Sequence, residues 1–121
     1  MKKFTITVAK TAGFCFGVDR AVKLVYNEIY SGCKAATLGE IIHNPTVVND
    51  LKERGVRVIS SPDEALEGER VVIRSHGAGA DVYRRLEELG IGYSDGTCPF
   101  VRRIQKIAED CSQKGMTVVI M

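Results

Sequence analysis

Both histidines and two of the four cysteines in this chain of 121 residues stand in short segments rich in glycine, proline and small polar residues. Cys15 occurs in the segment GFCFG, His43 in HNP, His76 in SHG and Cys98 in DGTCP. Thiolates are preferred ligands of soft metals and iron–sulfur clusters, and imidazoles donate hydrogen bonds to anions. The four residues are therefore our candidates for binding a metal and an anionic ligand.

The two cysteines in these segments share features that favour a function. Glycines flank the segment around Cys15, and glycine lets the backbone approach a bulky group closely. Cys98 precedes Pro99, which predicts that Cys98 is the N-cap of a helix, and a helix N-terminus stabilises a thiolate. The alternative is a pair of buried structural thiols. Cys33 and Cys111 fall past a helix end and on an apolar helical stripe, so we expect them to be packing or surface thiols.

The histidines favour a phosphate-bearing ligand over a local metal site. His43 and His76 have polar neighbours and glycine turns, and imidazoles together with helix N-termini can hold phosphate. The sequence has no GxxxxGK[ST] loop, and residues 77–79 lack the third glycine of a dinucleotide fingerprint. The absence of CxxC and CxxH pairs excludes zinc ribbons, zinc knuckles and thioredoxin-type motifs. Any metal site must therefore combine distant parts of the chain.

The elements that must position these residues alternate between strand and helix. We expect strands at residues 4–9, 36–38, 56–59, 71–73, around 93 and at 117–121, helices at 18–30, 45–54, 81–89 and 99–114, and a short helical turn at 61–68. This order predicts an α/β fold with a mainly parallel sheet flanked by helices. Strand-to-helix turns of a parallel sheet share its carboxyl edge, where ligands bind. We therefore expect Cys15, Cys98, His43 and His76 to converge on one rim.

Composition excludes several other classes of protein. Hydrophobic residues make up 45% of the chain, charged residues 26%, and the net charge is +2, which is typical of a globular domain. Basic and acidic residues are interspersed, so we expect no nucleic acid partner and a solvated face at Arg102, Arg103 and Lys106. No apolar run approaches the roughly 18 residues of a membrane span, and the N-terminus is not a signal peptide. We therefore expect a cytoplasmic protein without structural disulfides.

The C-terminal residues leave two interpretations open. Residues 117–121 have the pattern of an apolar strand and no polar tail follows them. The chain is either a natural or constructed truncation of a longer protein, or a complete small domain whose last strand closes the sheet.

Four motifs are similar, in order and spacing, to the N-terminal part of the 4-hydroxy-3-methylbut-2-enyl diphosphate reductase family. They are GFCFGVDRA at 13–21, GEIIHNP at 39–45, RSHG at 74–77 and TCPFV at 97–101, and together they cover nearly the whole chain. Gly96 is a departure, since alanine is more usual there. The resemblance implies a trefoil of three α/β domains around a 4Fe–4S cluster. Residues 1–97 would be the first domain, and 98–121 the opening helix and strand of a truncated second.

The resemblance also implies roles for the four residues. Cys15 and Cys98 match two of three cysteine ligands of the cluster, and His43 and His76 match histidines that bind the substrate diphosphate. The family's reaction removes the allylic hydroxyl with two electrons and protons, which gives isopentenyl and dimethylallyl diphosphates. Ferredoxin or flavodoxin usually supplies the electrons.

Chain length sets a limit on what this chain is expected to do. Family members are more than twice as long, so the third cysteine, a further diphosphate-binding histidine and the proton-delivering glutamate are all expected beyond Met121. We therefore predict no catalytic residue here, and a chain that alone binds a cluster poorly or not at all and does not turn over. Two alternatives are a small α/β module that binds a phosphorylated ligand and has structural cysteines, and a thiol redox protein that pairs Cys15 with Cys98.

Overall fold

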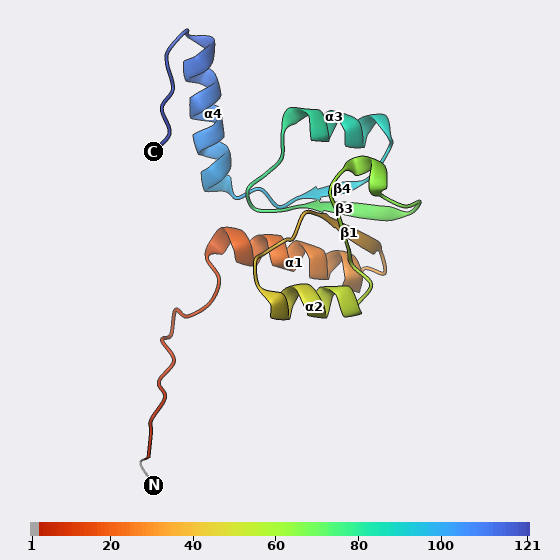
Figure 1. Ribbon diagram of the computed structural model, residues 1–121, viewed down its shortest axis with the longest axis vertical. Helices are drawn as coiled ribbons and strands as arrows, with labels where there is room; N and C mark the ends of the chain where they lie inside the picture. The colour runs from red at the N-terminus through yellow and green to blue at the C-terminus, as the bar shows by residue number, and fades with distance from the viewer. Residues whose placement is uncertain (1–2) are drawn as a thin grey trace.

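The computed structural model describes residues 3–121, so the first two residues of the predicted domain 1–97 lie outside the described part. A four-stranded sheet carries helices on both faces (Figure 1), which confirms the predicted α/β class. The elements are α1 (Phe16–Tyr30), β1 (Lys34–Leu38), α2 (Pro45–Glu53), β2 (Arg57–Ile59), η1 (Pro62–Glu64), β3 (Glu69–Ile73), α3 (Ala80–Glu88), β4 (Tyr93–Asp95) and α4 (Pro99–Gln113). All strand pairs are parallel, in the order β2-β1-β3-β4.

Two apolar cores form because successive side chains of a strand point to opposite faces of the sheet. Ala35 and Val72 pack on one face with the apolar stripe of α1. Ala36 and Val71, their neighbours in sequence, pack on the other face with Leu86 of α3. The continuous apolar run of β3 is thus explained by a strand that is covered on both faces.

The local signals at α2 place the segment that carries His43. Asn44 is the N-cap of α2, and its side-chain oxygen accepts hydrogen bonds from the amides of Thr46 and Val47 at 3.1 and 3.3 Å. Pro45 follows at the first helical position, where its missing N–H costs nothing. The predicted start of this helix is therefore confirmed, and the residue before the cap is fixed at the end of the β1–α2 connection.

The four strands end level with one another. Leu38 of β1 pairs with Ile59 and Ile73, and Ile73 of β3 pairs with Asp95 of β4. The segments that follow β1, β3 and β4 therefore leave the sheet at the same edge, as predicted for the candidate site.

Two predicted strands are absent at the ends of the described chain. Residues 4–9 alternate like a strand, but they lie alone as an extended segment that runs away from the sheet (Figure 1), with Phe4 85% and Ile6 88% exposed. Residues 117–121 are likewise extended and exposed, and Met121 is fully accessible. A strand exists only through hydrogen bonds to a neighbour, and neither segment pairs with the four-stranded sheet. Both strand predictions are wrong for this structure.

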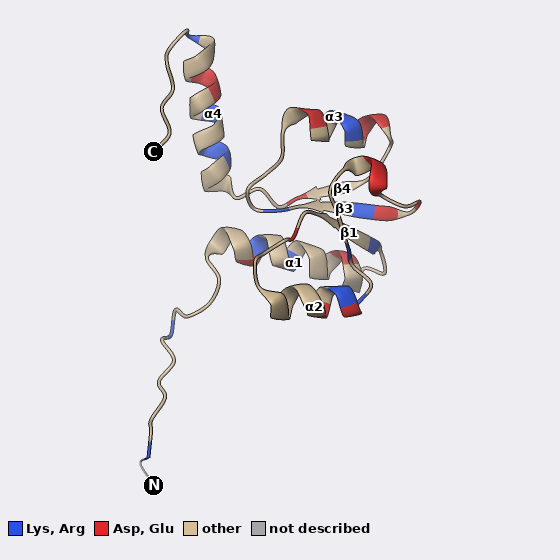
Figure 2. Cartoon of the chain, in the orientation of Figure 1, with Lys and Arg blue, Asp and Glu red and all other residues tan. Residues whose placement is uncertain are grey.

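Helix α4 stands apart from the two cores. It buries none of its residues, and Ile104 and Ile107 on its predicted apolar stripe stay more than half exposed. Figure 2 shows acidic and basic positions interspersed along α3 and α4. Within residues 3–121, no helix combines the length and apolar character that crossing a bilayer requires.

Candidate functional site

The four predicted site residues all lie at the carboxyl edge of the sheet or beside it. His43 follows β1, His76 follows β3 and Cys98 follows β4, at strands whose ends are in register. Cys15 reaches the same region differently from the prediction. It is the N-cap of α1, which contacts β1 and β3, and an extended segment rather than a strand precedes it.

The Cys98 side chain lies directly against the first turn of α1. A Cβ atom added to Gly17 would stand 2.7 Å from the Cys98 sulfur and 2.8 Å from its Cβ. Gly17 is the second residue of the helix that Cys15 caps, and an N-cap side chain lies beside the second and third helical amides. The Cys98 side chain therefore lies two residues along the helix from Cys15, although the two cysteines come from opposite ends of the domain.

Aromatic packing holds the two helix N-termini together beside these thiols. The rings of Phe16 and Phe100 meet edge to face, with centroids 6.4 Å apart. Each phenylalanine is in the first turn of its helix, one or two residues after a candidate cysteine. Cys98 is the N-cap of α4, as predicted, so both thiols stand at the positive end of a helix dipole.

His43 is an open side chain with one acidic neighbour. Its side chain is 79% exposed, and its Nδ1 lies 3.3 Å from a carboxylate oxygen of Glu40. It lines a pocket of about 300 Å³ together with Glu40, Asn44 and Pro45, and neither candidate cysteine nor His76 contributes to that pocket. A single hollow shared by all four residues therefore remains a prediction.

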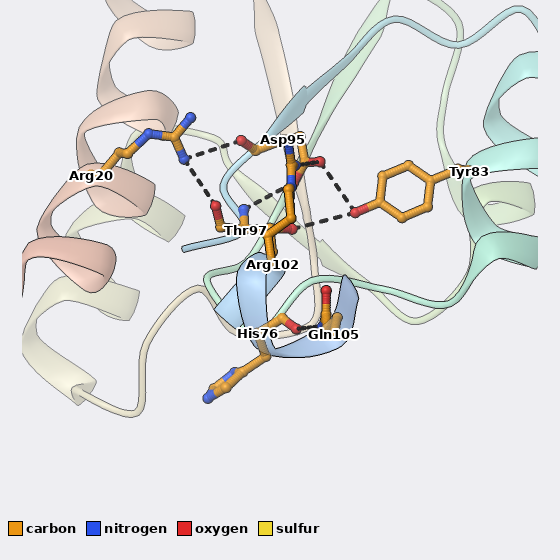
Figure 3. A network of polar contacts seen from close by, with 7 residues as sticks. All are labelled: Arg20, His76, Tyr83, Asp95, Thr97, Arg102 and Gln105. Atoms are coloured by element: carbon orange, nitrogen blue, oxygen red, sulfur yellow. Dashed lines mark hydrogen bonds and ion pairs between the residues drawn. The ribbon is translucent and has the colours of Figure 1, made fainter. Parts of the chain in front are cut away.

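His76 is anchored through its backbone, which leaves its ring free. Its carbonyl accepts a hydrogen bond from Nε2 of Gln105 on α4, at 3.2 Å. The imidazole is exposed and points away from the polar network around it (Figure 3). Like His43, it is held in place by its neighbours while its ring nitrogens stay accessible to a ligand.

The segment that carries Cys98 is fixed by a network that the sequence did not reveal (Figure 3). Asp95 accepts hydrogen bonds from the amide and the hydroxyl of Thr97 at 2.9 and 2.5 Å, and one from Tyr83 of α3 at 3.3 Å. Arg102 of α4 forms an ion pair with the same carboxylate. Burial acts to raise the pKa of Asp95, but the hydrogen bonds from Thr97 and the charge of Arg102 outweigh it, so the pKa lies below its usual range.

The backbone of the segment is held from two further elements. Arg20 of α1 donates to the carbonyls of Asp95 and Thr97, both at 3.3 Å. The amide of Cys98 donates to the carbonyl of Ser75 at 2.9 Å. Every one of these bonds joins the segment to an element at the carboxyl edge, so the position of Cys98 is set by the whole edge.

Sequence reasoning missed Arg20, Asp95 and Tyr83, and it described Arg102 as part of a solvated face. Arg102 does remain 60% exposed in its side chain, but it also pairs with Asp95. The local part of the network had a readable signal, because an aspartate two residues before a threonine amide is a common turn-forming arrangement. The contacts of Arg20 and Tyr83 cross the fold, and no spacing along the chain predicts them.

Cys15 and Cys98 are the right type of ligand for an iron–sulfur cluster, but two thiols are too few to hold one. All four cysteines are free thiols, and Cys15 and Cys98 adjoin the same helical turn. Thiolates are the usual ligands of such clusters. Across residues 3–121 no three cysteine, histidine or acidic side chains come together as a metal site. These two thiols therefore fit part of a cluster site, and at least one further ligand has to come from elsewhere.

Comparison with known proteins gives a consistent result. The family model described as "LytB protein" matches residues 6–121. The 4-hydroxy-3-methylbut-2-enyl diphosphate reductase of Caldanaerobacter subterraneus subsp. tengcongensis is 48% identical over 120 residues, and that of Alkaliphilus oremlandii is 43% identical over 118 residues. Each match covers 96% of this chain, which spans only 42% of the length of either relative.

Solved structures agree with this comparison. The structure of an (E)-4-hydroxy-3-methyl-but-2-enyl diphosphate reductase, described as the terminal enzyme of the non-mevalonate pathway, superposes with a TM-score of 0.76 and 43% identity. The match covers 91% of this chain and 39% of that one. A reductase from Plasmodium falciparum superposes with a TM-score of 0.77, but at 21% identity it supports the fold alone.

Proposed function

The chain belongs to the LytB protein family, and from that membership we propose that it forms the N-terminal part of a 4-hydroxy-3-methylbut-2-enyl diphosphate reductase. Residues 1–97 constitute its first domain, and residues 98–121 open a second. The observation that carries the proposal is the contact of the Cys98 side chain with Gly17, beside Cys15. Two cysteines from distant parts of the chain, one capping the first turn of α1 and one packed against it, are what a shared cluster needs.

Cys15 and Cys98 are two of the ligands of a 4Fe–4S cluster in this proposal, and the third cysteine comes from outside this chain. When bound, the cluster would pass electrons from the donor to the substrate and would offer an iron with an open position as a Lewis acid for the substrate hydroxyl. Both cysteines stand at the N-terminus of a helix, α1 for Cys15 and α4 for Cys98, where the helix dipole is positive. The edge-to-face pair Phe16 and Phe100 keeps the two N-termini adjacent.

His43 and His76 bind the diphosphate of the substrate. They stand on the segments after β1 and β3, which are neighbouring strands, and both rings are exposed. Their backbones are fixed by the Asn44 cap and by Gln105, so little further ordering is needed when the ligand binds. Binding energy from this remote end of the substrate orients its allylic carbon for loss of the hydroxyl, which leaves as water after two electrons and two protons are taken up.

The remaining elements of the proposal lie outside this chain. The proton donor and a third phosphate-binding histidine belong to later residues of the protein. Ferredoxin or flavodoxin delivers the electrons in the cytoplasm, where the free thiols of this chain stay reduced.

The test is anaerobic reconstitution of the complete protein with iron and sulfide. Wild type should become brown and convert 4-hydroxy-3-methylbut-2-enyl diphosphate with a chemical reductant. Cys15→Ser and Cys98→Ser should abolish the colour, and Cys33→Ser is the matched control that should keep it, because Cys33 lies at the opposite end of α1. His43→Ala and His76→Ala should keep the colour and raise KM at least tenfold.

The division of roles is open to direct contradiction. Loss of the colour in either histidine variant would show that this histidine is needed for cluster binding rather than for binding the diphosphate. Retention of colour and activity in both cysteine variants would remove Cys15 and Cys98 from the cluster site. A wild type that stays colourless and inactive but still binds the diphosphate would favour the alternative, a phosphate-binding module with structural cysteines.

A further inference from the structure

Residues 95–99 form a short connection between β4 and α4, and four elements hold it. Its carbonyls bind Arg20 of α1, the Cys98 amide binds the carbonyl of Ser75 after β3, and Tyr83 of α3 and Arg102 of α4 reach its first side chain. Asp95 and Thr97 both take part through backbone and side chain, and the Thr97 hydroxyl also lies 3.3 Å from the Tyr83 hydroxyl. The Asp95 carboxylate is the common acceptor, because Thr97, Tyr83 and Arg102 all donate to it.

The two carboxylate oxygens of Asp95 accept hydrogen bonds from different partners. Oδ1 accepts the amide and hydroxyl of Thr97 and so closes a tight turn immediately before Cys98. Oδ2 faces Tyr83 and Arg102. The bonds of Oδ1 shape the connection itself, and those of Oδ2 tie it to neighbouring helices.

The direction of the Cys98 side chain depends on that turn. With Cys98 fixed by its amide at Ser75 and by the turn at Thr97, its sulfur is directed onto Gly17. Gly96, inside the turn, is equally constrained, because a Cβ there would lie 2.2 Å from the carbonyl oxygen of Ile73. The backbone contacts of Gly96 and Cys98 thus restrict most of the connection, and the Asp95–Thr97 hydrogen bonds restrict the rest.

We propose that Asp95 is a positioning residue whose Oδ1, through its two bonds to Thr97, holds the Cys98 thiol beside Cys15. In this role Asp95 acts through Thr97 and Cys98, because its carboxylate is engaged by Thr97, Tyr83 and Arg102. The proposal deepens the proposed function, because it explains how two of the cluster ligands are kept ready for a metal before any metal binds. Its geometric content, the spacing of two thiols, can be measured without a cluster.

A second carboxylate of the chain serves as a matched control. Asp50 on α2 also accepts a tyrosine hydroxyl, from Tyr26 at 2.6 Å, and also pairs with an arginine, Arg54 at 2.8 Å. It lies on a helix and takes no part in the connection that bears Cys98. Replacing Asp50 tests whether the loss of any tyrosine- and arginine-bound carboxylate changes the spacing of the two thiols as the loss of Asp95 does.

The experiment measures cross-linking of the two thiols by dibromobimane, which becomes fluorescent on joining two cysteines. The 121-residue chain is used with Cys33→Ser and Cys111→Ser, so that only Cys15 and Cys98 react. The parent should cross-link within one molecule. Asp95→Ala should slow the cross-linking at least fivefold, whereas Asp50→Ala and Asp95→Asn should stay within twofold of the parent. The asparagine retains an oxygen that accepts from Thr97 but carries no charge.

The outcomes separate this proposal from the proposed function. An Asp95→Ala rate equal to the parent rate would overturn it, and so would an Asp95→Asn rate as slow as that of Asp95→Ala. If Asp95→Ala loses its circular dichroism spectrum, Thr97→Val gives the second measurement, because it removes the hydroxyl that donates to Asp95 and contacts Tyr83 and keeps the Thr97 amide. A rate at least twofold slower supports the proposal, and an unchanged rate overturns it. Absence of a cluster in the complete protein, with these rates as expected, would refute the reductase assignment alone.

Discussion

Replacing Gly17 with alanine is the sharpest test of the contact on which the site depends. The new Cβ would lie 2.7 Å from the Cys98 sulfur, whereas ordinary contacts begin at 3.4 Å. Overpacking of this kind costs about 1–3 kcal/mol. The substitution also removes a glycine from α1, which stabilises a helix by about 1 kcal/mol. The expected result is a net loss of about 1 kcal/mol in the free energy of unfolding.

A double-mutant cycle isolates the contact from the helix propensity. Cys98→Gly removes both atoms that the new methyl group would meet. In that background the Gly17→Ala change should stabilise the protein, so the two substitutions should show a coupling of about 1–3 kcal/mol. Urea unfolding monitored by circular dichroism gives all four free energies.

The same variant has a chemical readout at the thiols. A methyl group at position 17 occupies the space of the Cys98 sulfur, so the cross-linking of Cys15 to Cys98 should slow. If Gly17→Ala instead stabilised the chain by about 1 kcal/mol with no coupling to Cys98→Gly, the Cys98 side chain would not lie against α1. Cys98 would then not share a site with Cys15.

Three further predictions concern residues that shape the carboxyl edge. Gly96→Ala should lower the free energy of unfolding by about 3 kcal/mol, because its Cβ would meet the carbonyl oxygen of Ile73 at 2.2 Å; an unchanged urea midpoint would contradict the described backbone. Asn44→Ala should cost about 1 kcal/mol through loss of the α2 cap, and Asn44→Ser should restore most of it in the same assay. Folding lowers the pKa of Asp95, so its contribution to stability should be complete above the unfolded-state pKa of about 3.9 and should decline as the pH falls through the lower pKa of the folded state. Urea midpoints between pH 2 and 7 should therefore depend less on pH in Asp95→Asn, and an equal slope would show that Asp95 does not contribute.

Much of the fold followed from local signals that the structure retains. Pro45 after Asn44, and Pro99 after Cys98, correctly marked two helix starts, because caps act through neighbouring residues only. The covered strand at residues 71–73 was equally clear from its apolar run. The resemblance of four motifs to a reductase family is confirmed by the family match and by relatives up to 48% identical.

The errors have one physical origin, which is that strand formation depends on a partner. Residues 4–9 and 117–121 have the composition of strands, but the described sheet offers them no neighbour, and their side chains are exposed. The network around Asp95 was missed for a related reason. Arg20 reaches it across more than seventy positions of sequence, and only the completed fold brings the two together.

In the described part of the chain, helix α4 is attached to the rest of the domain only at its N-terminal end, which Cys98 caps. Within residues 3–121, its hydrogen bonds and ion pairs to the rest of the domain all come from the stretch that ends at Gln105. Fifteen residues make a rod of about 22 Å, so a tilt of about 10° at the base moves the far tip by about 4 Å. A displacement of the tip by this amount needs only a small rotation at the base, where the bonds of Thr97 and Ser75 keep Cys98 at the edge of the sheet.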